Sequence, residues 1–143
     1  MKKSTFLQVV SIIAIVSATI GFDAVLNNFA ALIATTTQAR SIPLMYGDCF
    51  LAFLTQMACL AGGICGFIYC SKPKKMDLCF RLGFTWLVTA FLSNITSILL
   101  AASGVDYFYL KSAMLLFFIV LSIGLPIIYV SAVFSFKQKN GNH

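Results

Sequence analysis

Charged residues are scarce in this sequence: they make up 10% of its 143 residues, while hydrophobic residues make up 60% and the mean hydropathy is +0.96. So few charges and so high a hydropathy exclude an ordinary soluble domain. The apolar runs show no alternation of polar and apolar residues over segments of about ten residues, which excludes a transmembrane β-barrel. In lipid the backbone must then satisfy its own hydrogen bonds within helices.

The net charge of +6 does not indicate a nucleic-acid partner. Such a partner needs a basic patch on a solvated face. Here the basic residues stand at the ends of apolar runs instead. We therefore predict the lipid bilayer as the main partner and no nucleic acid.

Groups that carry catalysis or bind metals are also scarce. The single histidine, His143, is the last residue, and the chain has no Cys-x-x-Cys pair at its outer side. Cys70 and Cys79 flank "SKPKKMDL" without a second pair to complete a zinc site. We therefore predict no enzyme, no cofactor and no metal. The cysteines are expected to act as small buried hydrophobes: Cys49, Cys59, Cys65, Cys70 and Cys79.

Four apolar runs are long enough to cross a bilayer, at about 6–34, 46–70, 82–104 and 113–136. The breaks between them, "TTTQARSIP", "SKPKKMDLCFR" and "SGVDYFYLKS", are too short to hold another domain. The predicted fold is an all-α integral membrane four-helix bundle with antiparallel up-down topology and short loops. Residues 1–143 form one transmembrane domain in this interpretation.

The distribution of lysine and arginine predicts the orientation, because basic residues near a membrane favour the cytoplasmic side. With the N-terminus inside, Arg40 and Lys111 are the basic residues left outside. Both termini are then cytoplasmic, and the "MKK" start suggests a bacterial cytoplasmic (inner) membrane. Trp86 would lie near an inner interface. The residues on the inner side are Lys2, Lys3, Lys72, Lys74, Lys75, Arg81, Lys137 and Lys139.

An alternative interpretation treats residues 1–18 as a cleaved signal peptide, because a basic start precedes an apolar core that ends with Val16 and Ala18. The apolar pattern continues to Ala34, however, which favours a retained helix. Cleavage would leave three spans in the same orientation.

An outer rim of mixed charge is the first candidate site. Asp23 lies 17 residues after Phe6, hence about 25 Å through a core of about 30 Å, close to the outer boundary. The rim could form an ion-pair network or an exterior site for a cation or partner. A solvated rim with weak pairs is the favoured interpretation. Its members are Asp23, Asn27, Asp48, Asp106, Arg40 and Lys111.

A polar layer near the middle of the bilayer is the second candidate. Gln56 and Asn94 fall near the centre of their spans, with Ser17 and Ser122 at similar depth. Amides in lipid should turn inward and hydrogen-bond between helices, which favours a packing role over a transport site. No ionisable residue is predicted in this layer, which argues against ion-coupled transport.

Small residues recur every fourth position at Ala58, Gly62 and Gly66, and more weakly at Ala14 and Ala18. Such ridges allow two helices to approach closely. The neighbour is either another helix of the chain or a second copy.

These features predict a small non-catalytic multi-pass membrane protein that acts through helix contacts with a membrane partner or with itself, in an accessory, regulatory or immunity-type role. The alternative is a small transporter or channel formed by oligomerisation.

Overall fold

The computed structural model describes residues 4–34, 42–102 and 112–141. They form four long helices: α1 (Thr5–Ala34), α2 (Ile42–Tyr69), α3 (Met76–Ala102) and α4 (Ser112–Gly141). A single turn of 3-10 helix, η1 (Pro73–Lys75), joins α2 to α3. The predicted all-α four-helix bundle is therefore confirmed.

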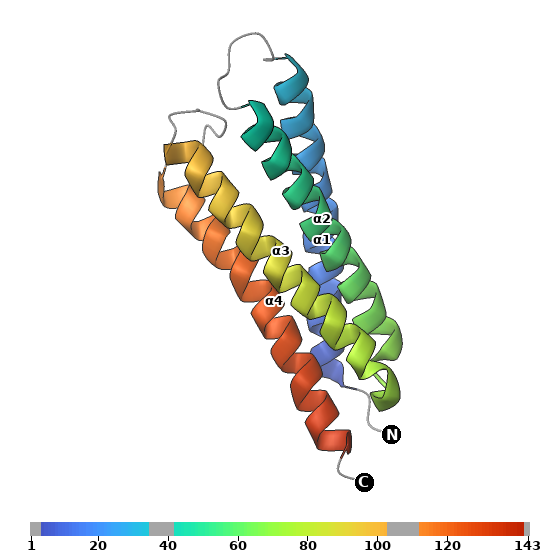
Figure 1. The fold of residues 1–143 in the computed structure, drawn as a ribbon. Coiled ribbons are helices and arrows are strands. Elements are labelled where there is room, and N and C mark those ends of the chain that lie inside the picture. The colour runs from blue at the N-terminus through green and yellow to red at the C-terminus, as the bar shows by residue number, and fades with distance from the viewer. Residues whose placement is uncertain (1–3, 35–41, 103–111, 142–143) are drawn as a thin grey trace.

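Successive helices run in opposite directions, so the start of α1, the turn at η1 and the end of α4 all lie at one end of the bundle (Figure 1). We call this the terminal end. Backbone contacts are most extensive between α1 and α2 and between α2 and α3, less extensive between α3 and α4, and less extensive still between α1 and α4. The pair α1–α2 and the pair α3–α4 diverge toward the opposite end.

The start of α1 is fixed by local hydrogen bonds. The Ser4 side chain caps the helix by accepting a bond from the Leu7 amide at 3.2 Å, the usual role of serine at this position. The Ser4 amide donates to the Cys70 carbonyl oxygen at 3.3 Å. The beginning of α1 is thereby attached to the end of α2.

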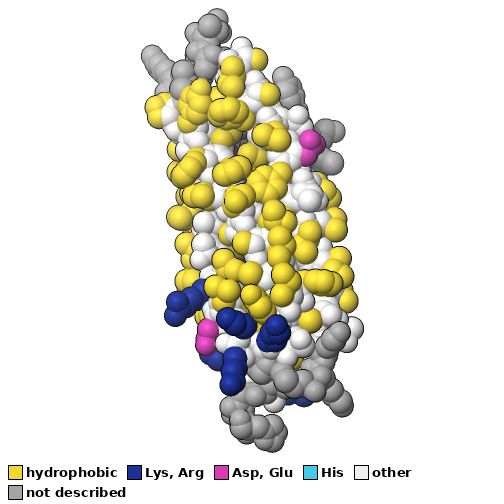
Figure 2. All heavy atoms as spheres, turned by 90° about the vertical axis from the view of Figure 1, so that its right-hand side faces the viewer, with side chains coloured by type: hydrophobic (Ala, Val, Ile, Leu, Met, Phe, Trp, Pro, Cys, Tyr) yellow, Lys and Arg dark blue, Asp and Glu magenta, His cyan; other side chains and the backbone are white. Residues whose placement is uncertain are grey.

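All four helices are long and apolar enough to cross a membrane, over Thr5–Ala34, Pro43–Tyr69, Met76–Leu100 and Ile119–Lys139. Hydrophobic side chains cover most of the face that Figure 2 shows, and each of the four helices exposes large hydrophobic side chains. A soluble protein would place charged residues there. This surface is suited to lipid.

The larger cluster of buried side chains lies in the terminal half and includes Tyr129, which is fully buried. Its hydroxyl donates to the Gly62 carbonyl oxygen at 2.5 Å. A Cβ atom at Gly83 would come within 2.7 Å of the Tyr129 ring. The glycines of α2 and α3 therefore make the space that this large side chain occupies.

The lysines and arginines that the structure describes gather at the terminal end (Figure 2). One of them, Lys137 of α4, forms an exposed ion pair with Asp77 of α3 at 2.6 Å. Six of the eight basic residues predicted for the inner side lie at this end: Lys72, Lys74, Lys75, Arg81, Lys137 and Lys139. The other two, Lys2 and Lys3, lie outside the described residues.

Candidate functional site

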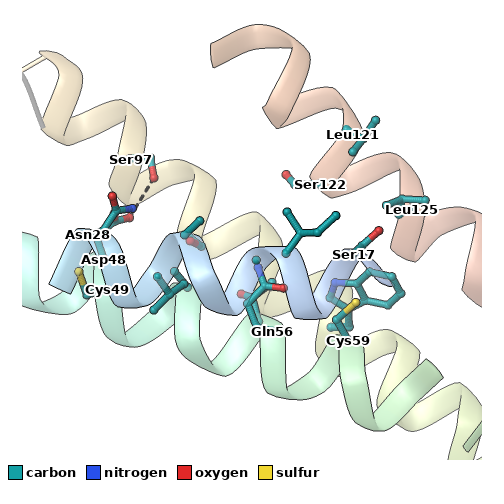
Figure 3. Close-up of a pocket in the computed structure, with 18 residues that line it drawn as sticks. Ser17, Asn28, Asp48, Cys49, Gln56, Cys59, Ser97, Leu121, Ser122 and Leu125 are labelled. Atoms are coloured by element: carbon teal, nitrogen blue, oxygen red, sulfur yellow. Dashed lines mark hydrogen bonds between the residues drawn. The ribbon is translucent and has the colours of Figure 1, made fainter. Parts of the chain in front are cut away.

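A cavity of about 460 Å³ lies between the four helices. Pockets that bind small molecules commonly measure about 300–1,000 Å³. Figure 3 shows Asp48, Gln56 and Cys59 in succession along α2, with Ser97 reaching in from α3 and Ser122 from α4. The polar residues that line the cavity are Ser17, Asn28, Asp48, Thr55, Gln56, Ser93, Ser97 and Ser122.

Three helices line the cavity over stretches of equal length, at residues 17–28, 48–59 and 86–97. Each stretch covers a rise of about 16 Å. The lining residues of α1 and α2 recur at steps of three and four, so that each helix presents one face. Small residues at Gly21, Ala24 and Ala52 leave the space open.

Trp86 and Cys59 lie at the end of the cavity nearer the terminal end. The Trp86 side chain is 4% exposed and packs on Tyr129, with ring centroids 5.9 Å apart. It therefore separates the cavity from the dense core. The ring of Trp86, which the sequence predicts near the inner interface, turns inward between the helices.

Asp48 lies in the second turn of α2 at the other end of the cavity, and it is 3% exposed. Its Oδ1 accepts hydrogen bonds from the hydroxyls of Thr96 at 2.6 Å and Ser97 at 2.9 Å (Figure 3 shows the second). Thr96 Oγ1 also lies 2.8 Å from the Ser93 carbonyl oxygen, and its single proton serves one acceptor at a time. Asp48 thus connects α2 to α3.

The position of Asp48 differs from that expected for a member of a loop-borne rim. The helix begins at Ile42 rather than near Tyr46, so Asp48 is already within a regular turn and faces the bundle interior. The described lysines and arginines lie at the far, terminal end. Hydroxyl groups therefore hold this carboxyl group where the rim hypothesis proposed charged partners.

The other rim residues do not join Asp48 in the described structure. Asp23 is exposed on α1, where its Oδ2 accepts a bond from Asn27 Nδ2 at 3.3 Å. These two side chains share a face, as their spacing predicts, but neither lines the cavity. The remaining three rim residues, Asp106, Arg40 and Lys111, lie outside the described residues.

The residues of the predicted polar layer all lie on or beside the cavity. Gln56, Ser17 and Ser122 line it. Asn94 of α3 donates from Nδ2 to Ser122 Oγ of α4 at 2.7 Å, so one pair bonds between helices. Gln56 and Ser17 instead face the open space, with the Gln56 side chain beside Gly21.

The small-residue ridge is used inside the chain. A Cβ at Gly66 would collide with Ser11 Oγ of α1, and Gly62 contacts Tyr129 of α4. The Cys59 thiol donates to the Ala14 carbonyl oxygen at 3.1 Å. The ridge members are all buried: Ala14, Ala18, Ala58, Gly62 and Gly66.

Sequence reasoning missed Ser93 and Ser97 as partners in this site, together with Asn28 and Thr55. A usable signal existed, because Ser93 and Ser97 are four apart and therefore share one face of α3. Asp48, Ala52 and Gln56 follow the same spacing on α2. The sequence does not show whether each of these helix faces points toward the bundle interior or toward lipid.

No protein-family model, no curated protein and no solved structure matches this chain. Its four apolar helices make it a small multi-pass membrane protein. The cavity adds to that description a set of hydroxyl, amide and carboxyl groups drawn from every helix. Such a lining is able to hold a small polar molecule by hydrogen bonds.

Proposed function

We propose that this chain is a non-catalytic membrane protein that admits a small polar solute to the cavity between its helices, in the role of a small transporter or channel. The observation that carries the proposal is the cavity itself, with polar side chains from all four helices. The predicted alternative placed such a pathway between copies of the chain. The cavity supports a pathway within one bundle.

The polar side chains in the lining support this proposal energetically. A buried hydroxyl or amide without a hydrogen-bond partner is unfavourable. Transfer of such a group from water to cyclohexane, which forms no hydrogen bonds, costs about 4–8 kcal/mol. The Gln56 and Ser17 side chains line the cavity, where Gln56 also lies beside Gly21 of α1. Water or a polar solute in the cavity would supply hydrogen-bond partners for these two side chains.

The helix-contact hypothesis has less support. Its main evidence in the sequence was the small-residue ridge, and Gly62 and Gly66 contact residues of the same chain. An accessory, regulatory or immunity-type role would have to use the apolar outer surface instead. Lipid is sufficient to cover that surface, so it does not by itself indicate a protein partner or a homo-oligomer.

The orientation predicted from the basic residues suggests where the solute enters. If the terminal end faces the cytoplasm of a bacterium, then Asp48 and Asn28 lie in the half of the bundle nearer the exterior. The solute would enter from that side. Trp86 and the dense core around Tyr129 would close the path toward the cytoplasm.

The experiment is a permeability measurement on proteoliposomes containing the full chain. A panel of glycerol, urea and methylammonium is applied in osmotic-shift experiments followed by light scattering. We expect at least one solute to cross faster than in protein-free vesicles. Equal rates for the whole panel with and without protein would contradict the proposal.

A matched pair of variants connects any permeability to the cavity. Ala52→Phe places a ring in the cavity, and Ala30→Phe adds the same ring to the exposed face of α1. We expect the first to abolish the added permeability and the second to preserve it. If both variants lose the added permeability, or if neither does, the solute does not cross through this cavity.

A further inference from the structure

We infer that the cavity is selective for a small organic cation, with the Asp48 carboxylate as the group that holds its positive charge. This inference rests on the proposed function, since it names the class of solute. The observation that carries it is the placement of Asp48, which is buried and lies at the cavity wall between α2 and α3.

The carboxylate has capacity left for a further donor. An ionised carboxylate offers about four lone-pair positions, and the hydroxyls of Thr96 and Ser97 both bind the same oxygen, Oδ1. These bonds also fix the orientation of the group against α3. A cationic head in the cavity would find an acceptor already in place.

The rest of the lining carries no opposing charge. Among the residues that the structure describes, those along the cavity include no lysine or arginine, and Asp48 is their one formally charged member. Because the lining is largely apolar, the field of a single carboxylate is screened less than in water. A cation would be attracted along the cavity and an anion repelled from it.

The mixture of lining groups favours an organic ammonium ion over a metal ion. Calcium requires six to eight oxygen ligands, and magnesium requires a strict octahedron. Here apolar side chains, including Ile20, Val25 and Leu121, are interspersed with the polar ones along the cavity. The ring of Trp86 at the far end offers an apolar surface to the body of such an ion. An ammonium group attached to a short apolar body matches this mixture of one carboxylate, several hydroxyl and amide groups, and apolar side chains.

Cys49 is a built-in reporter because it adjoins Asp48 in the chain and also lines the cavity. Proteoliposomes of the full chain are treated with one of two methanethiosulfonate reagents, one bearing a trimethylammonium group and the other a sulfonate. Mass spectrometry of peptides then gives the rate of modification at Cys49. Each rate is divided by the rate of the same reagent with a small free thiol.

We expect the cationic reagent to modify Cys49 faster than the anionic one by a normalised factor of about ten or more, where tenfold corresponds to 1.4 kcal/mol. Asp48→Asn should bring the factor near one. Asp23→Asn, which removes an exposed acid outside the cavity, should leave it unchanged. Tetramethylammonium chloride should slow modification of the unaltered chain.

A factor near one in the unaltered chain would overturn the inference, and so would a large factor that persists in Asp48→Asn. The measurement on the unaltered chain decides the matter even if Asp48→Asn does not fold. Modification at equal normalised rates by both reagents would contradict the selectivity for cations, but it would still support a cavity that solutes reach. If neither reagent modifies Cys49, and no solute of the panel crosses faster with the protein than without it, the proposed function itself is contradicted.

Discussion

Replacing Gly66 by alanine should destabilise the bundle, whereas the same replacement at Gly62, one turn earlier on α2, should not. A Cβ at Gly66 would collide with Ser11 Oγ and come within 2.9 Å of the Tyr129 hydroxyl oxygen and 3.0 Å of its Cε2. At Gly62 the nearest atom would be 3.8 Å away, which is ordinary contact.

The difference between the two variants follows from these contacts. Adding atoms to a well-packed core costs about 1–3 kcal/mol. Both variants also gain the preference of helices for alanine over glycine, up to about 1 kcal/mol, and this gain cancels in the comparison. Tyr129 has little room to retreat, because its hydroxyl is bonded to the Gly62 carbonyl oxygen at 2.5 Å. We therefore expect Gly66→Ala to be less stable than Gly62→Ala by about 1–3 kcal/mol.

The assay is equilibrium unfolding in mixed micelles, with a rising fraction of sodium dodecyl sulfate in dodecyl maltoside. The emission of Trp86, which packs on Tyr129, reports the loss of the core. The unaltered chain is the common reference for both variants. Equal unfolding midpoints for Gly66→Ala and Gly62→Ala, or a greater loss for Gly62→Ala, would refute the packing described for this ridge.

Three further substitutions test separate contacts by the same unfolding assay. Tyr129→Phe removes the hydroxyl bonded to Gly62 and should cost about 0.5–1.5 kcal/mol; an unchanged midpoint would mean that this bond is not formed. Asn94→Leu removes the bond to Ser122 and should cost about 0.6–2 kcal/mol. A stability equal to that of the unaltered chain would mean that this bond does not stabilise the contact between α3 and α4. Gly124→Ala adds a Cβ with no heavy atom within 4 Å and should be neutral or stabilising, so a clear loss of stability would show that this face of α4 is occupied.

Hydropathy was sufficient to predict the four helices, but it underestimated their ends. The third helix was expected from residue 82 and begins at Met76, because Asp77 and Arg81 lower the hydropathy of its first turns while remaining compatible with a helix. The fourth was expected to end at residue 136 and continues to Gly141. A helix is able to extend beyond the apolar run that crosses the lipid.

The cavity could not be predicted because hydropathy gives depth and not direction. Gln56 and Ser17 were correctly grouped by depth with Asn94 and Ser122, and all lie on or beside the cavity. Whether such groups bond to each other or face an open space depends on how each helix is rotated about its axis. For Asp48 that rotation places the carboxyl group against α3 instead of in solvent.

The accessibility of Trp86 to water-soluble molecules is the most direct test of a solute-accessible cavity. Trp86 is the single tryptophan of the chain, lines the cavity and is 4% exposed. Its fluorescence in proteoliposomes is measured with acrylamide in the water and, separately, with brominated acyl chains in the lipid. We predict that acrylamide quenches the emission, that Ala52→Phe suppresses this quenching, and that brominated lipid has little effect. Strong quenching by brominated lipid with none by acrylamide would contradict a cavity open to water between the four helices.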